Sequence, residues 1–182
     1  MQADNRFVWI DLEMTGLDPN VDVILEISCL ITDDQLNVVA QGPSLVIKQP
    51  DEKLAQMIPL VRALHDRSGL TPLVRESQVN LGQACTAVLD FIQEQCIKNT
   101  ALLCGNSVWQ DRRFLQAYMP EIVNYLHYRM IDVSVIKECV RRWYPKDSAT
   151  WFVKKESHRA LDDILESIEE LRYYRHTFFI KK

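Results

Sequence analysis

The segment Ile10-Asp11-Leu12-Glu13 carries two carboxylates two residues apart in a strand-like run. Alternate residues of a β-strand point to the same face, so Asp11 and Glu13 should lie side by side. Like charges this close raise a pKa unless a cation lies between them, and Mg²⁺ and Mn²⁺ prefer oxygen ligands. The segment therefore predicts a divalent metal site, although a strand that simply ends in exposed acids would have the same pattern.

A further acid, Asp111, follows the short apolar run 101–104 and the capping sequence Gly105-Asn106-Ser107. A helix from about residue 107 to 119 would place Asp111 one turn inside, on the face of Ser107. Such an acid could join a metal site. It could equally stabilise the first helical turn through the helix macrodipole.

A histidine with an acid pair one turn later, His158 followed by Asp162 and Asp163, opens the last helix, for which Ser157 is the predicted N-cap. If His158 lies within a regular helix, Asp162 shares its face. If His158 instead lies in the loop at the cap, Asp163 is equally possible. The spacing alone leaves both acids open.

The elements that must position these residues form a mixed α/β pattern over a single domain, residues 1–182. Apolar alternation predicts three strands with short links, which favours an antiparallel meander. Helical periodicity and two short apolar runs complete the order βββ-α-β-α-β-α-α, a mixed five-stranded sheet flanked by helices. The predicted strands are 6–12, 23–32, 38–47, 101–104 and 130–132, and the predicted helices are 79–97, 107–119, 134–143 and a last one with the apolar stripe Leu161, Ile164, Leu165, Ile168 and Leu171.

Composition indicates a soluble globular protein, with 47% hydrophobic and 25% charged residues. No apolar run approaches the ~18 residues that span a bilayer, and the polar start has no signal-peptide character, so we expect a cytoplasmic protein without a membrane partner. A protein with a net charge of -4 is poorly suited to bind long nucleic acid through counterion release. A short anionic substrate remains compatible where a metal ion supplies the positive charge.

Taken together, the acid motifs resemble those of the DEDDh exonucleases, which have the ribonuclease-H-like, DnaQ-like fold. Four longer segments are similar to the oligoribonuclease family: VWIDLEMTGLDP, CGNSVWQDRRFL, HYRMIDVS and SHRALDDILESIEELRYYR. The resemblance implies a 3′–5′ exoribonuclease that degrades very short RNA, down to dinucleotides, to nucleoside 5′-monophosphates with two divalent cations, Mg²⁺ or Mn²⁺. It also implies that Asp163, rather than Asp162, is the metal ligand at the start of the last helix.

The resemblance assigns roles to residues of this chain. It implies His158 as the general base that takes a proton from water, and Tyr128 as a catalytic residue. It implies a homodimer in which the segment Tyr128-Arg129 of one subunit completes the site of the other. The implied metal ligands are Asp11, Glu13, Asp111 and Asp163.

For the substrate, the resemblance implies that Leu17 is a wedge against a base. Leu60 is the aligned residue where many family members have a tryptophan that packs on a base, so aromatic stacking is lost there. The implied contacts of the terminal phosphate are Ser107, His65, Arg129 and Ser134, with Arg129 as the main charge partner.

Two other functions fit parts of the pattern. One is a DEDDh exonuclease that trims or proofreads longer DNA or RNA 3′ ends. The other is a ribonuclease-H-like binding module without catalysis, which the intact acids and His158 argue against. Comparing rates on dinucleotides and on a 20-mer would separate the three.

Overall fold

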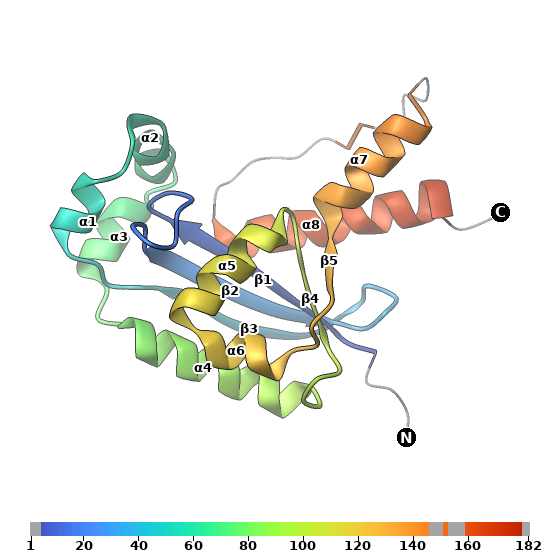
Figure 1. The fold of residues 1–182 in the computed structure, drawn as a ribbon, viewed down its shortest axis with the longest axis horizontal. Coiled ribbons are helices and arrows are strands. Elements are labelled where there is room, and N and C mark those ends of the chain that lie inside the picture. Colours follow the sequence, from blue (N-terminus) through green and yellow to red (C-terminus); the bar gives the residue numbers. More distant parts are fainter. Residues whose placement is uncertain (1–4, 146–150, 153–158, 180–182) are drawn as a thin grey trace.

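The sheet at the centre of the computed structural model has the strand order β3-β2-β1-β4-β5 (Figure 1). The structure describes residues 5–145, 151–152 and 159–179. β1 pairs antiparallel with β2 and parallel with β4, β2 pairs antiparallel with β3, and β4 pairs parallel with β5. The predicted fold class and meander are confirmed. The strands are β1 (Phe7–Met14), β2 (Ile24–Thr32), β3 (Val38–Val46), β4 (Leu102–Gly105) and β5 (Met130–Asp132).

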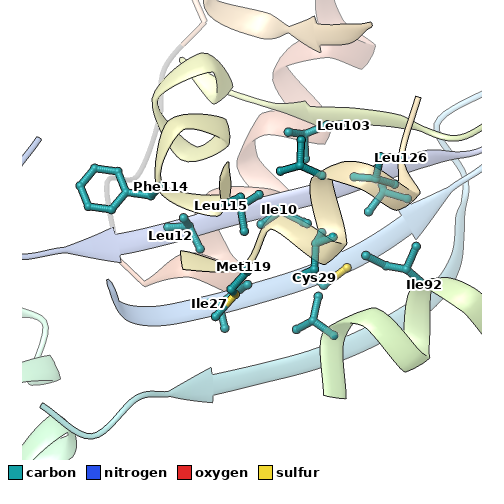
Figure 2. Packing of buried hydrophobic residues seen from close by; sticks show 14 of the residues in the cluster. Ile10, Leu12, Ile27, Cys29, Ile92, Leu103, Phe114, Leu115, Met119 and Leu126 are labelled. Atoms are coloured by element: carbon teal, nitrogen blue, oxygen red, sulfur yellow. The ribbon is translucent and has the colours of Figure 1, made fainter. Parts of the chain in front are cut away.

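Helices cover both faces of the sheet, and the alternation along β1 divides the core between them (Figure 1). Val8, Ile10 and Leu12 pack in one cluster with side chains from α4, α5 and α6, part of which Figure 2 shows. Trp9 points to the other face, in a cluster with α7 and α8. The helices are α1 (Asp51–Ala55), α2 (Pro59–Arg67), α3 (Leu70–Glu76), α4 (Leu81–Gln95), α5 (Val108–Tyr118), α6 (Pro120–Tyr125), α7 (Val133–Trp143) and α8 (Ala160–Tyr174), the last followed by a π-helical turn, Arg175–Phe179.

Four helices of the structure, α1, α2, α3 and α6, were not predicted. They have 5, 9, 7 and 6 residues, too short for a clear apolar period. Pro120 begins α6, because a proline at the first helical position lacks only an N–H that would be unpaired there.

The predicted start of the last helix is wrong. α8 begins at Ala160 with Arg159 as its N-cap residue, and Ser157 itself lies outside the described residues. Glu26 accepts a hydrogen bond from the Ala160 backbone N–H at 3.3 Å, which satisfies one of the first N–H groups of α8 that have no partner within the helix. The predicted apolar stripe is also narrower than expected, because Leu165 is 42% exposed.

None of the described helices is long and apolar enough to cross a membrane.

Candidate active site

Three of the predicted metal ligands come together beside the C-terminal half of β1. Asp11, Glu13 and Asp163 each offer a carboxylate oxygen, and these oxygens all lie within 4.8 Å of one another. The first two residues share a face of β1, and the third lies in the first turn of α8. Asp162 is exposed, so of the two acids that spacing left open, Asp163 is the one the fold brings to β1.

Asp111 is not one of these three grouped acids, but it lies beside them. Its Oδ1 accepts a hydrogen bond of 3.0 Å from the backbone N–H of Leu12, the residue between the two acids of β1. β4 runs parallel to β1 and leads directly into α5, so the first turn of α5 reaches the end of β1. The predicted cap position of α5 is confirmed, because Ser107 is its N-cap residue, although its φ of 52° is left-handed and its side chain makes no cap hydrogen bond.

Burial and mutual repulsion raise the pKa of two of these acids. The pKa of Glu13 is raised to about 8, chiefly by desolvation and then by the charges of Asp163, Glu26 and Asp111. The pKa of Asp111 is raised to about 7 by desolvation, against the lowering effect of its hydrogen bond from Leu12. Protonation near neutral pH is the response of crowded carboxylates without a cation.

The residues present fit a hard divalent cation. Several carboxylate oxygens converge within one ion's reach, and Mg²⁺ and Mn²⁺ favour such donors over nitrogen or sulfur. A cation at this position would offset the repulsion that raises the pKa of Glu13. The arrangement can therefore bind metal and act on a phosphodiester, which is the chemistry that paired metal ions support.

His65 packs against the end of β1. Its Nε2 lies 2.8 Å from the carbonyl oxygen of Met14, and its Nδ1 lies 3.7 Å from a carboxylate oxygen of Glu13. The side chain is buried. The fold therefore brings this predicted substrate residue to the acidic cluster.

The two leucines expected to contact bases are both exposed. Leu17 is 69% exposed in the loop after β1, and Leu60 is 68% exposed near the start of α2. The carbonyl oxygen of Leu17 accepts hydrogen bonds from Gln110 and Arg113, which tie the loop to α5. Exposed leucines of this kind are available to a ligand.

Ser107 and Ser134 lie together at the ends of β4 and β5. Their hydroxyl oxygens are 3.1 Å apart, and Asp132 accepts from the backbone N–H groups of both serines at 2.9 Å. Ser134 also donates to the side-chain oxygen of Asn106 at 3.0 Å. Sequence reasoning missed the positioning roles of Asp132 and Asn106, although an Asp directly before a helix is a recognisable N-cap signal.

Tyr128 and Arg129 lie on the loop between α6 and β5, and both are exposed. The Tyr128 ring stacks on His127 with ring centres 4.5 Å apart, and the Arg129 guanidinium lies 5.3 Å from the centre of the Tyr128 ring. Arg112 donates to the Tyr128 carbonyl oxygen at 2.8 Å, which fixes the loop on α5.

His158, the predicted general base, lies outside the described residues, so its role stays a prediction. Sequence reasoning also missed Glu26 and Arg159, which adjoin the cluster. Arg159 donates to Glu26 through Nε and Nη2. No local pattern could have found this pair, because its members are 133 residues apart.

Comparison with known proteins gives the class first. The exonuclease family model matches residues 8–171. Exonuclease I from Methylocaldum szegediense superposes with a TM-score of 0.69 at 19% identity, over 95% of this chain and 41% of that one, which shows the shared fold. These matches define an exonuclease domain.

Two relatives give the narrower family. The human protein named mitochondrial oligoribonuclease is 52% identical over 177 residues, 97% of this chain and 75% of that protein. The oligoribonuclease of Shewanella sp. strain MR-4 is 51% identical over 180 residues, 98% of this chain and 99% of that protein. The chain belongs to the oligoribonuclease family of 3′–5′ exoribonucleases.

Proposed function

We propose that this protein degrades very short RNA, down to dinucleotides, from the 3′ end and releases nucleoside 5′-monophosphates. The observation that carries the proposal is the convergence of Asp11, Glu13 and Asp163 within 4.8 Å. Family membership supports the direction and the substrate class. The acting unit is proposed to be one exonuclease domain, residues 1–182.

The proposed metal ligands are the three clustered acids and Asp111, and the proposed cofactors are two ions of Mg²⁺ or Mn²⁺. When bound, such a pair stabilises the attacking and leaving oxygens of an in-line displacement. The four carboxylates would hold the two ions. The backbone N–H of Leu12 orients the carboxylate of Asp111. His158, with a reference pKa of ~6.5, accepts the proton of the attacking water.

The proposed substrate contacts surround this centre. Leu17 wedges against one base, and Leu60 covers a base without aromatic stacking. Ser107, Ser134, His65 and Arg129 hold the terminal 5′ phosphate. The hydrogen bonds that Asp132 accepts from both serine N–H groups support this assignment, because they place two hydroxyls together.

The proposed assembly is a homodimer in which Tyr128 and Arg129 of one subunit complete the site of the other. The exposure of both side chains supports this arrangement, since each is available to a second chain. A cytoplasmic location is proposed from the similarity to bacterial oligoribonucleases, whereas the human relative is named mitochondrial.

The experiment that tests the substrate class compares initial rates on a 5′-phosphorylated dinucleotide and on a 20-mer RNA at equal concentration of 3′ ends. We expect the dinucleotide to be hydrolysed faster. A higher rate on the 20-mer would instead indicate an exonuclease that trims or proofreads longer 3′ ends. Binding of both RNAs without hydrolysis in Mg²⁺ and in Mn²⁺ would indicate a binding module.

The terminal-phosphate contact has a sharper test in Arg129→Ala. A charge-assisted hydrogen bond contributes ~1.5–3 kcal/mol, so affinity for a 5′-phosphorylated dinucleotide should fall about 10–150-fold. The same dinucleotide without its 5′ phosphate should bind both proteins equally. Titrations in Ca²⁺ measure binding without fast hydrolysis, and equal losses for the two ligands would contradict the phosphate contact.

A further inference from the structure

Glu26 is a buried carboxylate directly beside the acidic cluster. It lies on β2 opposite Glu13 in the antiparallel register, and it is 1% exposed. A buried acid next to three others should either bind the same cation or have a partner of its own. Its partner is Arg159, the residue directly before α8.

Arg159 neutralises Glu26 with a two-pronged contact. Its Nε lies 3.2 Å from both carboxylate oxygens of Glu26, and its Nη2 lies 2.7 Å from Oε1. Oε2 also accepts from the backbone N–H of Ala160 at 3.3 Å. One strand residue therefore holds both the N-cap residue and the first residue of α8.

This contact lies one helical turn from the acid that α8 brings to the cluster. The backbone N–H of Asp163 donates to the carbonyl oxygen of Arg159 at 3.0 Å. The position of Arg159 on the sheet therefore determines where the first turn of α8 places Asp163 relative to Asp11. The helix is packed on the sheet farther along by Ile164 and Ile168, but those contacts are apolar and less directional.

We propose that Glu26 and Arg159 are positioning residues that hold Asp163 at the distance from β1 at which it can share a cation with Asp11 and Glu13. This inference rests on the carboxylate metal site proposed above. Neither residue is proposed to touch the metal or the substrate. Their loss should weaken cation binding in addition to the fold, whereas loss of a buried ion pair far from the cluster should weaken the fold alone.

Two variants separate positioning from simple electrostatics. Glu26→Gln removes a negative charge near the site, and on charge alone it should weaken cation binding. Arg159→Gln removes a positive charge, and on charge alone it should tighten binding. Positioning predicts weaker binding in both, by about 10–100-fold, the range for residues that orient metal ligands.

The matched control is Glu170→Gln, which removes another buried acid of an ion pair, this one between α8 and α7. Glu170 is fully buried and pairs with Lys137 at 2.8 Å, about two turns beyond Asp163. This variant should lower thermal stability and leave cation affinity unchanged. It therefore shows what loss of a buried ion pair does on its own.

The measurement is calorimetric titration of the full chain with Mn²⁺ alone, well below the unfolding temperature of each variant. Weaker Mn²⁺ binding in Arg159→Gln, with Glu170→Gln like the wild type, is the expected result. Tighter or unchanged binding in Arg159→Gln overturns the inference, and this variant decides even if Glu26→Gln fails to fold. If instead Asp11→Ala binds Mn²⁺ as the wild type does, the proposed metal site itself is wrong.

Discussion

The acids at two places along α8, Glu170 alone and Asp163 with Asp11 and Glu13 of β1, are compensated in opposite ways. Around Glu170 the protein supplies the partners: Lys137 at 2.8 Å, Asn106 at 3.1 Å and the Tyr174 hydroxyl at 3.1 Å. The charges that act most strongly on Glu13 are those of other acids. Together with burial they raise its pKa to about 8. The same helix therefore carries one internally neutralised carboxylate, Glu170, and contributes Asp163 to a crowded cluster.

The difference indicates which group serves the fold and which serves function. A buried charge with donors on both oxygens stabilises one packing arrangement. Carboxylates crowded together destabilise the fold until a cation binds, which is typical of a functional site that holds a ligand from outside the chain. The contrast predicts that the two groups respond oppositely to substitution.

Asp11→Ala should have the largest effect on activity. Removing a ligand should abolish measurable hydrolysis of a dinucleotide in Mg²⁺ or Mn²⁺. Without metal, the unfolding temperature should stay the same or rise, because one repelling charge is gone. Asp162→Ala is the matched control, since this acid is exposed and adjacent to Asp163, and it should retain activity. Wild-type turnover in Asp11→Ala would exclude the carboxylate assignment.

Glu170→Gln should have the opposite profile. Breaking a buried ion pair by removing one partner is strongly destabilising, and Lys137 keeps some access to solvent, so we expect a loss of about 2–4 kcal/mol in the free energy of unfolding. Chemical denaturation in EDTA measures it. Stability equal to the wild type would mean that this network contributes little, and the comparison between the two groups would fail.

The pH dependence of the metal-free protein should report the crowded group. The folded pKa of Glu13 is about 8 against an ordinary pKa of 4.5, so the folded state binds more protons than the unfolded state between these values. Stability is then highest at low pH within this window and falls as the pH rises toward 8. Asp111, with a pKa of about 7, should add to the same trend.

Thermal unfolding at pH 5 to 8, with EDTA and with Mn²⁺, measures this trend. Each kcal/mol lost should lower the unfolding temperature by roughly 2–4 °C for a chain of this size. Mn²⁺ should reduce the fall of the unfolding temperature with pH, because the cation takes the place of the protons on the carboxylates. Glu13→Gln should reduce it without metal, which separates Glu13 from the histidines. If neither Mn²⁺ nor Glu13→Gln changes the pH dependence of the unfolding temperature, the titrating groups are others.

The sequence was sufficient for the parts of the site that depend on local geometry. The period of two along a strand placed Asp11 and Glu13 on one face, and the structure brings their oxygens together. Spacing could not choose between Asp162 and Asp163, because that choice depends on where α8 begins. At that start the Ala160 N–H donates to Glu26, which is 134 residues earlier in the chain, and only the folded chain brings the two together.

The fold shows the same limit. The meander and the long helix α4, with its capping box between Asn80 and Gln83, follow from alternation and helical period. The short helices α1 to α3 have no such period, and they form because side chains such as Leu54, Leu70 and Val74 pack together against Leu25 of β2. Tertiary packing rather than propensity stabilises them.

Ser134→Ala should have the smallest effect. It tests a residue that lies between the network around Glu170 and the proposed substrate site. The hydroxyl donates to Asn106, which also donates to Glu170, and it accepts from the Ser107 N–H at 3.0 Å. Loss of these neutral hydrogen bonds should lower stability by about 0.5–1.5 kcal/mol.

If Ser134 also helps to hold the terminal phosphate, affinity for a 5′-phosphorylated dinucleotide should fall less than about tenfold, and affinity for the unphosphorylated form should not change. Denaturation in EDTA and titration in Ca²⁺ measure the two effects separately. A stability loss with no change in phosphate dependence would place Ser134 wholly with the internally neutralised group around Glu170.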